Sequence, residues 1–378
     1  MYQDIAEREF KMRIVYAGGG TGGHINPALS IADYVKEKEE NAEALFIGTQ
    51  RGLEKKLVPA AGYNIEFIEI SGFDRKRIWR NAGVLLKLIK ANKKCVKLLK
   101  EFKPDAVVCT GGYVSGPVAI AAHKLKIPAL IHEQNVYPGL TVKGAEKYVD
   151  YVAVSFEETV NSMKIPEKCV VTGNPVRVEI LKAKKSEARK KLGLGNKPFV
   201  LVFGGSLGAQ KINDNMIEVI KKASASGEFQ LLFGTGERNY DEVCEALKRE
   251  NIVLNDEIKV VPYINNMAEV MAAADLVVAR SGAITVSEIA ALGKASILIP
   301  SPNVVRNHQE QNAREFEKNN AAVMIVEKDL TGELLYDKIK TTVTDEKLLE
   351  AMGENVKKMG KRDSLDKLYR LILKMTNR

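Results

Sequence analysis

The chain carries two series of short apolar runs that alternate with helical patterns, and each series opens in the same way. The first begins with the run RIVYA at 13–17 and the stretch GGGTGGHINPALS at 18–30. The second begins with the run FVLVF at 199–203 and the similar stretch GGSLGAQKINDNM at 204–216. Short β-rich runs separated by helical patterns predict parallel strands joined by helices. The repeated opening therefore predicts two similar α/β domains in tandem, each with a Rossmann-like parallel sheet.

Eleven apolar runs are expected to form the strands of the two sheets. They are RIVYA, ALFIG, IEFIEI, AVVCT, PALIH and YVAVS in the first half, and FVLVFG, FQLLFG, IKVVPY, DLVVA and ASILIP in the second. Gly-Asn-Pro and a charged helical segment between the halves indicate a boundary near 173–177. We expect an N-terminal domain at 1–172, a C-terminal domain at 173–358, and a C-terminal helix at 359–378 that packs back toward the first domain. The cleft between the domains is the expected site, because ligands bind beyond the carboxyl ends of parallel strands.

Two glycine-rich turns in the first half are typical of anion sites. In the first turn, at 18–23, glycine lets another molecule approach the backbone, and Asn26 and Pro27 are the expected N-cap and first residue of the next helix. Free N–H groups and the positive end of the helix dipole would converge on a phosphate there. The stretch TGGYVSGP at 110–117 repeats the arrangement and predicts a second phosphate site.

Several nucleotide-binding patterns are missing. The second strand ends ALFIGTQRG without the carboxylate of a dinucleotide site, and neither a Walker pattern nor an Asp-x-Asp pair occurs. Backbone amides and cationic side chains are therefore expected to carry the phosphate charge, with no metal and no cofactor. The four cysteines are scattered without CxxC spacing, which fits a reducing cytosol and not a zinc site.

Positive charge is concentrated between residues 74 and 100, a segment that contains ten Lys or Arg residues and one Asp. This excess of nine equals the net charge of the whole chain. The pattern predicts a basic amphipathic helix. This helix is either a surface helix with solvated lysines, or a surface that binds an anionic membrane or nucleic acid. The tryptophan favours the membrane. The expected membrane-contacting residues are Ile78, Trp79, Arg80, Leu85, Leu86 and Lys87.

The start of the chain lacks the apolar core of a secretory signal, and no run approaches the roughly 18 apolar residues of a spanning helix. A protein that is neither exported nor integral is therefore expected.

Seven blocks in one order resemble the GT-B glycosyltransferases, and within them the bacterial N-acetylglucosaminyltransferases of peptidoglycan synthesis. The blocks are GGGTGGHINPALSIA, TGGYVSGP, HEQNVYPG, GNPVR, FGGSLGA, RSGAITVSEIAALGKASILIP and NHQEQNA. The resemblance implies inverting, metal-independent transfer of N-acetylglucosamine from UDP-N-acetylglucosamine to the 4-hydroxyl of undecaprenyl-diphospho-N-acetylmuramyl-pentapeptide. It also implies a peripheral protein at the cytoplasmic face of the cell membrane, with other cell-wall synthesis proteins as further partners and no nucleic acid.

The resemblance also implies roles for individual residues. His24 is the first candidate for the general base and Glu133 is the alternative, while His132, Glu133 and Asn135 are expected to project at the cleft. The implied donor-binding residues are Thr21, Gly22, Gly23, Asn135, Arg177, Ser206, Ile264, Arg280, Glu288 and Gln309, with Asn213 and Asn312 as further candidates. The acceptor diphosphate is expected at Gly18, Gly19, Gly20, Thr110, Gly111, Gly112, Tyr113 and Ser115.

Among the donor-binding residues, Arg177 would stabilise the leaving diphosphate, Glu288 would bind the ribose hydroxyls and Ile264 would pack on the uracil. Two other hypotheses remain open. One keeps the fold and the UDP-sugar but changes the reaction, as in an epimerase or a transferase with another acceptor. The other is a non-catalytic basic protein that binds anionic surfaces through residues 74–100, and it predicts steep salt dependence.

Overall fold

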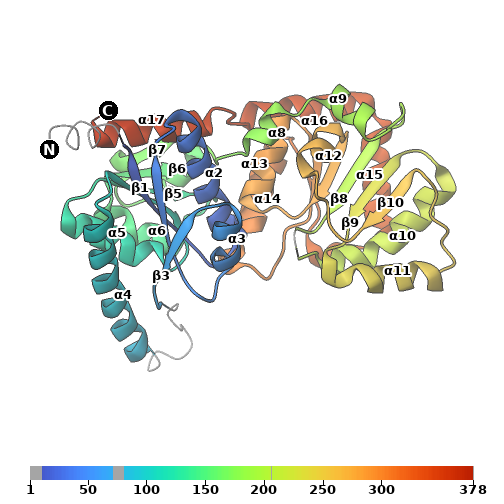
Figure 1. Cartoon of the computed structure of the whole chain (residues 1–378). Helices are drawn as coiled ribbons and strands as arrows, with labels where there is room; N and C mark the ends of the chain where they lie inside the picture. The colour runs from blue at the N-terminus through green and yellow to red at the C-terminus, as the bar shows by residue number, and fades with distance from the viewer. Residues whose placement is uncertain (1–10, 71–80, 206, 378) are drawn as a thin grey trace. The chain divides into compact units, whose positions relative to one another are not determined.

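The computed structural model describes residues 11–70, 81–205 and 207–377, which form two parallel β-sheets flanked by helices (Figure 1). The chain divides into two compact units: unit 1 is residues 1–175 with 362–378, and unit 2 is residues 176–361. Two parallel α/β sheets confirm the predicted fold class.

Unit 1 contains a seven-stranded parallel sheet in the order β3-β2-β1-β4-β5-β6-β7. Its strands are β1 Arg13–Gly18, β2 Glu43–Gly48, β3 Asn64–Phe67, β4 Ala106–Gly111, β5 Ala129–Glu133, β6 Tyr151–Val154 and β7 Cys169–Val171. Its helices are α2 Gly22–Lys38, α3 Glu54–Ala60, α4 Asn81–Phe102, α5 Ser115–Leu125, α6 Leu140–Ala145, α7 Glu157–Val160 and α17 Ser364–Thr376. The strand order runs outward from β1 on one side and from β4 on the other, so the topology switches between these two strands.

Unit 2 repeats this plan with six strands in the order β10-β9-β8-β11-β12-β13. Its strands are β8 Phe199–Phe203, β9 Gln230–Gly234, β10 Ile258–Val261, β11 Leu276–Ala279, β12 Ala295–Leu298 and β13 Val323–Met324. Its helices are α8 Val178–Lys182, α9 Lys185–Lys191, α10 Gln210–Ser226, α11 Tyr240–Arg249, α12 Met267–Ala273, α13 Ala283–Leu292, α14 His308–Lys318, α15 Gly332–Thr344 and α16 Glu346–Met359. Its topology switches between β8 and β11.

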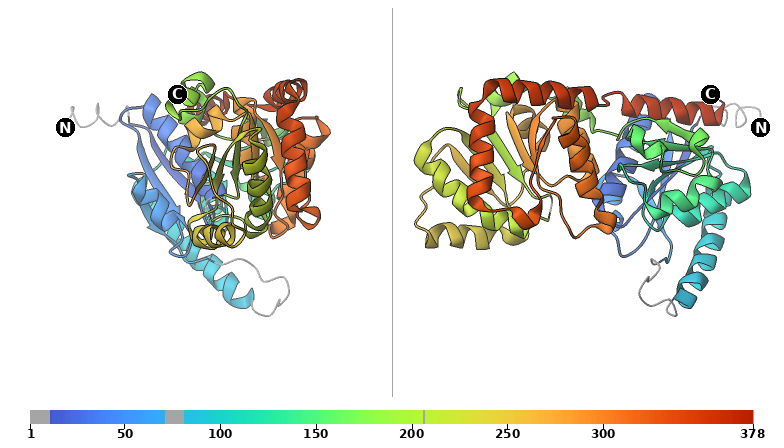
Figure 2. Two further views of the ribbon diagram at one scale, coloured as in Figure 1. Left: turned by 90° about the vertical axis from the view of Figure 1, so that its right-hand side faces the viewer. Right: turned by 180° about the vertical axis from the view of Figure 1, so that it is seen from behind.

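The strands are apolar because helices cover both faces of each sheet (Figure 2). In unit 1, Val15 of β1 packs in a core that includes Leu99 of α4 and Val118 of α5. The next residue, Tyr16, is also buried and stacks on Phe46 of β2, with ring centroids 5.1 Å apart. The two shortest strands, β7 and β13, were not among the runs expected from the sequence, because two or three residues are too few to show a pattern.

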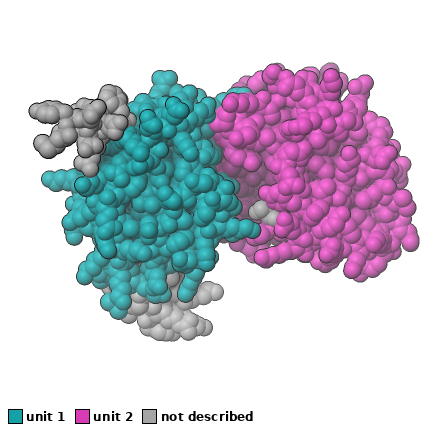
Figure 3. All heavy atoms as spheres, in the orientation of Figure 1, with its two compact units in different colours: residues 1–175, 362–378 teal, residues 176–361 magenta. Residues whose placement is uncertain are grey.

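The C-terminal helix α17 is part of unit 1, which comprises residues 1–175 and 362–378 (Figure 3). The sequence predicts domain limits at 172 and 358. Helix α17 packs beside α2, and the hydroxyl of Tyr369 donates to Glu39 Oε1 over 2.5 Å. The rings of Tyr369 and Tyr34 also form a T-shaped pair, with centroids 6.1 Å apart. These contacts hold the end of the chain on the first unit.

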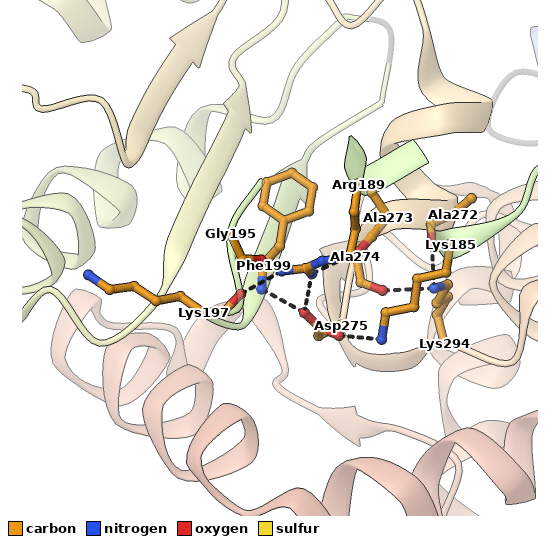
Figure 4. Close-up of polar contacts among 10 residues, drawn as sticks. All are labelled: Lys185, Arg189, Gly195, Lys197, Phe199, Ala272, Ala273, Ala274, Asp275 and Lys294. Atoms are coloured by element: carbon orange, nitrogen blue, oxygen red, sulfur yellow. Dashed lines mark hydrogen bonds and ion pairs between the residues drawn. The ribbon is translucent and has the colours of Figure 1, made fainter. Parts of the chain in front are cut away.

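In both sheets, an aspartate just before a central strand accepts a backbone N–H group of the neighbouring strand. Asp105, just before β4, accepts the N–H of Arg13 on β1 over 2.8 Å. Asp275, just before β11, accepts the N–H of Phe199 on β8 over 2.7 Å and also binds Arg189 over 2.9 Å (Figure 4). The same contact thus occurs at the corresponding strands β4 and β11 of the two sheets.

A buried lysine lies beside this cluster. Lys294 Nζ donates to the carbonyl oxygens of Ala272 (2.5 Å) and Ala274 (2.8 Å), at the end of α12 (Figure 4). Burial, and after it the neighbouring positive charge of Lys185, lowers the pKa of Lys294 to about 7. Lys294 is therefore a titrating group inside the folded unit.

Helix α4 forms the described part of the basic segment. Its inner face is Ala91, Cys95 and Leu99, all buried, and it lies beside α5. Leu86 and Ile89 are 63% and 48% exposed. The predicted membrane residues Ile78, Trp79 and Arg80 and the side chain of Leu85 lie outside the described residues. In the described parts of the chain, we find no helix with the length and apolar character needed to span a bilayer.

Candidate functional site

The site in unit 1 lies at the carboxyl ends of three neighbouring strands. β1 ends at Gly18, β4 at Gly111 and β5 at Glu133, and β4 lies between the other two. This edge includes the topological switch point, where ligands of doubly wound sheets bind. The motif blocks that begin at 18, 110 and 132 therefore come together in space.

Helix α2 begins earlier than the sequence suggested. Its N-cap is Thr21, so Asn26 and Pro27 lie inside the helix. The Thr21 carbonyl accepts the N–H groups of His24 (3.1 Å) and Ile25 (3.2 Å), which closes the first turn. The expectation for Asn26 and Pro27 was wrong because this backbone carbonyl starts the helix, and no side-chain preference reveals it. His24 consequently lies in the first turn, at the positive end of the helix dipole.

The imidazole of His24 contacts the turns that follow β4 and β5. Nδ1 lies 3.1 Å from Thr110 O and 3.2 Å from Gln134 Oε1. Thr110 Oγ1 donates to the carbonyl of His24 over 2.6 Å, so the backbone of the histidine is held as well. At Gly111, φ is +107°, and a Cβ would stand 2.6 Å from His24 Nδ1. Glycine is therefore required at 111 for both backbone conformation and space.

Buried hydroxyl groups tie the second glycine turn to β1. Ser115 Oγ accepts the N–H of Gly111 (3.0 Å) and lies 2.9 Å from the carbonyl oxygen of Ala17. Thr110 and Ser115 are fully buried, whereas Tyr113 is 61% exposed. Of the residues expected at the acceptor diphosphate, Thr110 and Ser115 thus bind protein groups, and Tyr113 is the exposed side chain of the turn.

Glu54, which belongs to none of the sequence motifs, binds the first glycine turn. This buried carboxylate accepts the N–H of Gly20 (2.9 Å), and also the N–H (2.9 Å) and hydroxyl (2.7 Å) of Thr49. The Gly20 N–H is thus directed at a carboxylate. The available signal was the flanking glycines, since a Cβ at Gly48 or Gly52 would stand 2.6 or 2.0 Å from this side chain.

Close packing accounts for the glycines that begin the first turn. A Cβ at Gly18 would stand 2.2 Å from Thr110 Oγ1, and one at Gly19 would stand 2.7 Å from Glu54 Oε1. A Cβ at Gly112, where φ is +77°, would stand 2.3 Å from the carbonyl oxygen of Gly19. These glycines let the two turns approach each other, which is a requirement separate from the anion binding that the sequence predicted.

Glu133 holds the loop that follows β5. Its Oε1 accepts the backbone N–H (2.9 Å) and side-chain amide (3.1 Å) of Asn135, and its Oε2 accepts the N–H of Gly139 (2.7 Å). Burial raises the pKa of Glu133, and these hydrogen bonds oppose the rise. Both carboxylate oxygens and the amide of Asn135 are therefore engaged within the loop.

Gln134 and His132 form a buried pair that no sequence pattern connects. Gln134 Nε2 lies 2.8 Å from Thr110 O and 3.0 Å from His132 Nδ1, and His132 Nε2 lies 3.0 Å from Gly173 O. Asn174 Nδ2 donates to the carbonyl of Gln134 over 2.9 Å, so the GNPVR block anchors the HEQN block. Burial lowers the pKa of His132 to about 4, which keeps the ring neutral.

His132 is fully buried, so the expectation that it projects at the cleft was wrong. A neutral imidazole whose two nitrogens both have hydrogen-bond partners is stable in the interior.

The corresponding edge of unit 2 carries the third glycine turn, after β8 and beside β11. Gly205 has φ +95° and would place a Cβ near no atom within 4 Å. Gly208 has φ +75°, and its Cβ would stand 2.1 Å from Thr235 O. Gly208 is thus fixed by packing, while Gly205 combines a glycine conformation with open space. Ser206 lies outside the described residues.

Arg177 and Glu288 bind each other. Arg177 Nε donates to Glu288 Oε1 over 2.8 Å, from the residue before α8 to the middle of α13. Glu288 is 5% exposed, while the side chain of Arg177 is 44% exposed. Burial raises the pKa of Glu288, and the charge of Arg177 opposes that rise. A buried acid paired with a half-exposed guanidinium is an arrangement suited to binding a polar, anionic ligand.

Arg280 and Ile264 also belong to unit 2. Arg280 Nη1 donates to the carbonyl of Ile299 (3.1 Å), and its Nη2 pairs with Glu327. These contacts hold the loop after β12. Ile264 is 7% exposed and packs over the end of β9, where a Cβ at Gly234 would stand 2.9 Å from its Cδ1. Both residues therefore have a packing role in the unit.

Three amide side chains expected at the donor bind backbone groups. Asn213 Nδ2 donates to Thr235 O (3.0 Å) and Asn312 Nδ2 donates to Ser281 O (3.2 Å), and both asparagines are fully buried. Gln309 Oε1 accepts a backbone N–H over 2.9 Å. The three residues fix the turns that follow β9, β11 and β12.

The described residues contain no group of three or more His, Cys, Asp or Glu side chains able to hold a metal ion. The four cysteines are free thiols. In unit 2, the half-exposed guanidinium of Arg177 and the turn at Gly205 are the features best suited to an anion.

Comparison with known families gives two matches that together cover most of the chain. Residues 14–154 match the glycosyltransferase family 28 N-terminal domain, and residues 199–368 match the family 28 C-terminal domain. A protein of Caldanaerobacter subterraneus named UDP-N-acetylglucosamine--N-acetylmuramyl-(pentapeptide) pyrophosphoryl-undecaprenol N-acetylglucosamine transferase is 49% identical over 97% of this chain and 100% of the relative. The Bacillus licheniformis protein of the same name is 46% identical over 96% of this chain and 98% of the relative.

Solved structures agree with this assignment. MurG of Acinetobacter baumannii has a TM-score of 0.77 at 27% identity, over 96% of this chain and 99% of that one. MnaA of S. aureus, solved with UDP, has a TM-score of 0.67 at 15% identity over 97% of both chains, and this likeness shows the fold alone. The chain therefore belongs to glycosyltransferase family 28 and has the GT-B fold, which confirms the family that its motif blocks indicated.

Proposed function

We propose that this enzyme transfers N-acetylglucosamine from UDP-N-acetylglucosamine to the 4-hydroxyl of undecaprenyl-diphospho-N-acetylmuramyl-pentapeptide, the conversion of lipid I to lipid II in peptidoglycan synthesis. The observation that carries the proposal is the 49% identity, over 97% of this chain, to a relative named for this transfer. The reaction is a single displacement that inverts the anomeric carbon.

His24 is the general base of the proposed reaction. It lies at the switch point of unit 1, its ring is held by Thr110 and Gln134, and imidazole is the side chain best suited to accept a proton near neutral pH. Glu133 is the weaker candidate, because N–H groups of Asn135 and Gly139 already occupy both of its oxygens. Its role is to shape the loop that follows β5.

The chemical step moves one proton and one sugar. As the 4-hydroxyl oxygen attacks the anomeric carbon, its proton passes to His24 and the bond from that carbon to the diphosphate oxygen breaks. The electron pair of this bond leaves with UDP, so negative charge grows on the diphosphate. Arg177 stabilises that charge through its terminal nitrogens, while Nε is held by Glu288. No Asp-x-Asp pair is available for a bridging metal, so we assign this task to Arg177 and to backbone amides.

The remaining donor contacts are also proposals. Glu288 binds the ribose hydroxyls, Ile264 packs on the uracil, and the amides of the turn at 204–208 with Ser206 bind the diphosphate. The sugar lies near Asn135 and the 21–23 turn. Arg280, Gln309, Asn213 and Asn312 act mainly by fixing the turns around the donor, because their polar groups already bind protein atoms.

The acceptor binds unit 1 at the membrane surface. We assign its diphosphate to the turn that contains Gly111, Gly112 and Tyr113 rather than to Gly20, because the Gly20 N–H is bonded to Glu54. Exposed Leu86 and Ile89 on the basic helix α4 would enter the headgroup region of an anionic inner leaflet. The enzyme is thus peripheral on the cytoplasmic face, where other cell-wall synthesis proteins can meet it.

A transfer assay tests the proposal, with radiolabelled UDP-N-acetylglucosamine and lipid-linked muramyl-pentapeptide as substrates. Label should move to the lipid, and His24→Ala should lower turnover roughly 100- to 10,000-fold with donor affinity barely changed. His123→Ala, at an exposed position of α5, is the matched control and should keep normal turnover. Label that changes its sugar without reaching the lipid would indicate an epimerase instead, and normal turnover of His24→Ala would move the base elsewhere.

A further inference from the structure

We propose that Gln134 is a positioning residue for the transfer, which holds His24 as the tautomer that has its proton on Nδ1 and its lone pair on Nε2. The proposal rests on the proposed function, in which His24 accepts the proton of the acceptor hydroxyl. It is carried by a chain of hydrogen bonds that runs from Gly173 through His132 and Gln134 to His24, entirely within unit 1.

Backbone carbonyl oxygens fix the direction of every bond in this chain, because a carbonyl can only accept. His24 Nδ1 lies 3.1 Å from Thr110 O, so this nitrogen carries a proton. The amide atom of Gln134 that lies 2.8 Å from Thr110 O must likewise be the nitrogen. The other amide atom, 3.2 Å from His24 Nδ1, is then the oxygen and accepts the same Nδ1 proton.

The far end of the chain is determined in the same way. His132 Nε2 lies 3.0 Å from Gly173 O and therefore carries the proton of that ring. His132 is buried and neutral, so its Nδ1 has a lone pair and accepts Gln134 Nε2–H over 3.0 Å. A flipped Gln134 would put its oxygen against both this lone pair and Thr110 O. The two histidines thus have opposite tautomers, and Gln134 joins them.

This arrangement matters for a base. In a neutral imidazole one nitrogen donates and the other accepts, and the hydrogen bond at one nitrogen decides the state of the other. With the proton fixed on Nδ1, Nε2 is the atom that receives the proton of the 4-hydroxyl. The resulting imidazolium keeps Nδ1–H bonded to Thr110 O and Gln134 Oε1, whose dipoles favour its positive charge.

Imidazole nitrogen NMR of the full-length enzyme at neutral pH tests the tautomers without any need for activity. The chain has four histidines, and substitution of each assigns its signals. His24 should show a protonated Nδ1 and an unprotonated Nε2, and His132 should show the reverse. A proton on Nε2 of His24 would overturn the proposal, whether or not the enzyme proves to use lipid I.

Gln134→Met, which keeps the length of the side chain and removes both polar atoms, tests the positioning role. Thr110 O still accepts the Nδ1 proton in this variant, but the second acceptor, Gln134 Oε1, is lost, so His24 should gain a population protonated on Nε2. The loss of this one hydrogen bond to His24 should lower kcat about 2- to 13-fold with UDP affinity unchanged. Ser155→Ala is the control, because it removes a buried bond to the carbonyl of Glu133 (2.8 Å) and should leave the His24 signals and kcat as they are.

Three results would contradict the positioning role: an unchanged His24 tautomer in Gln134→Met, an unchanged kcat in that variant, or an equal loss of kcat in Ser155→Ala. Failure of the transfer reaction itself would appear separately, as a wild-type enzyme that has the expected NMR signals and moves no label to the lipid.

Discussion

Arg177 Nε donates to Glu288 Oε1 over 2.8 Å, so two residues that the sequence assigned to different parts of the donor form one ion pair. The Glu288 carboxylate is buried in unit 2, whereas the Arg177 guanidinium is half exposed to solvent. Glu288 therefore orients Arg177 in addition to any contact with ribose. A change at either residue is expected to affect the binding of UDP.

Glu288→Gln should weaken UDP binding by about 1 to 3 kcal/mol, because it removes the charged partner of Arg177 and weakens the acceptor proposed for ribose. Isothermal titration calorimetry with UDP measures this directly. Glu333→Gln, at a position whose side chain is 72% exposed on α15, is the control and should bind UDP normally. Unchanged affinity in Glu288→Gln would remove this residue from the donor site.

Gly111→Ala should reduce turnover and stability together. Alanine at φ +107° is strained, and its Cβ would stand 2.6 Å from His24 Nδ1, so the ring must move. We expect a loss of about 1 to 3 kcal/mol in the free energy of unfolding, measured by urea denaturation, with a fall in kcat. Gly116→Ala is the matched control, since its Cβ would meet nothing within 4 Å. Equal kcat in the two variants would show that the position of His24 does not depend on Gly111.

The double variant Leu86→Glu with Ile89→Glu should weaken binding to anionic vesicles. Each apolar side chain contributes up to about 1.5 to 3 kcal/mol when fully buried, and the new carboxylates repel anionic headgroups. Vesicle co-sedimentation should therefore show at least a roughly tenfold loss, with transfer to a detergent-soluble acceptor retained. Val253→Glu, at an 83% exposed residue of unit 2, controls for added charge. Vesicle binding that equals the wild type would place the membrane surface elsewhere.

Lys294 should make the stability of the enzyme depend on pH. Its pKa is lowered from 10.5 to about 7 in the folded state, so the unfolded chain binds this proton more tightly. Stability contributed at Lys294 therefore rises as pH increases from about 7 toward 10.5, by about 1.4 kcal/mol for each unit of pKa difference. Urea denaturation across this range should show a steeper rise for the wild type than for Lys294→Met. Parallel profiles for the two proteins would contradict the lowered pKa, and Lys221→Met at an exposed position provides the control.

The sequence by itself determined the fold class, the family and the turns around which the candidate site is built. Alternating strand and helix patterns and two glycine-rich openings are local features, because a parallel strand buried on both faces needs a continuous apolar run. The order of the seven motif blocks can also be read directly from the sequence. His24, the glycines of the two turns and the Arg177–Glu288 residues can therefore be identified from the order of amino acids alone.

Only the tertiary structure decided which of those residues bind one another. Glu54 reaches Gly20 across 34 positions, and Gln134 joins His24 across 110. The start of α2 at Gly22 likewise depended on a backbone carbonyl, and the burial of His132 on a partner 41 residues away. Hydrogen bonds between distant segments leave no periodic trace in a sequence, because they depend on how strands lie side by side in the sheet. The residues of the site could thus be predicted from the sequence. Their hydrogen-bond partners, their protonation and their separate roles could be derived only from the folded structure.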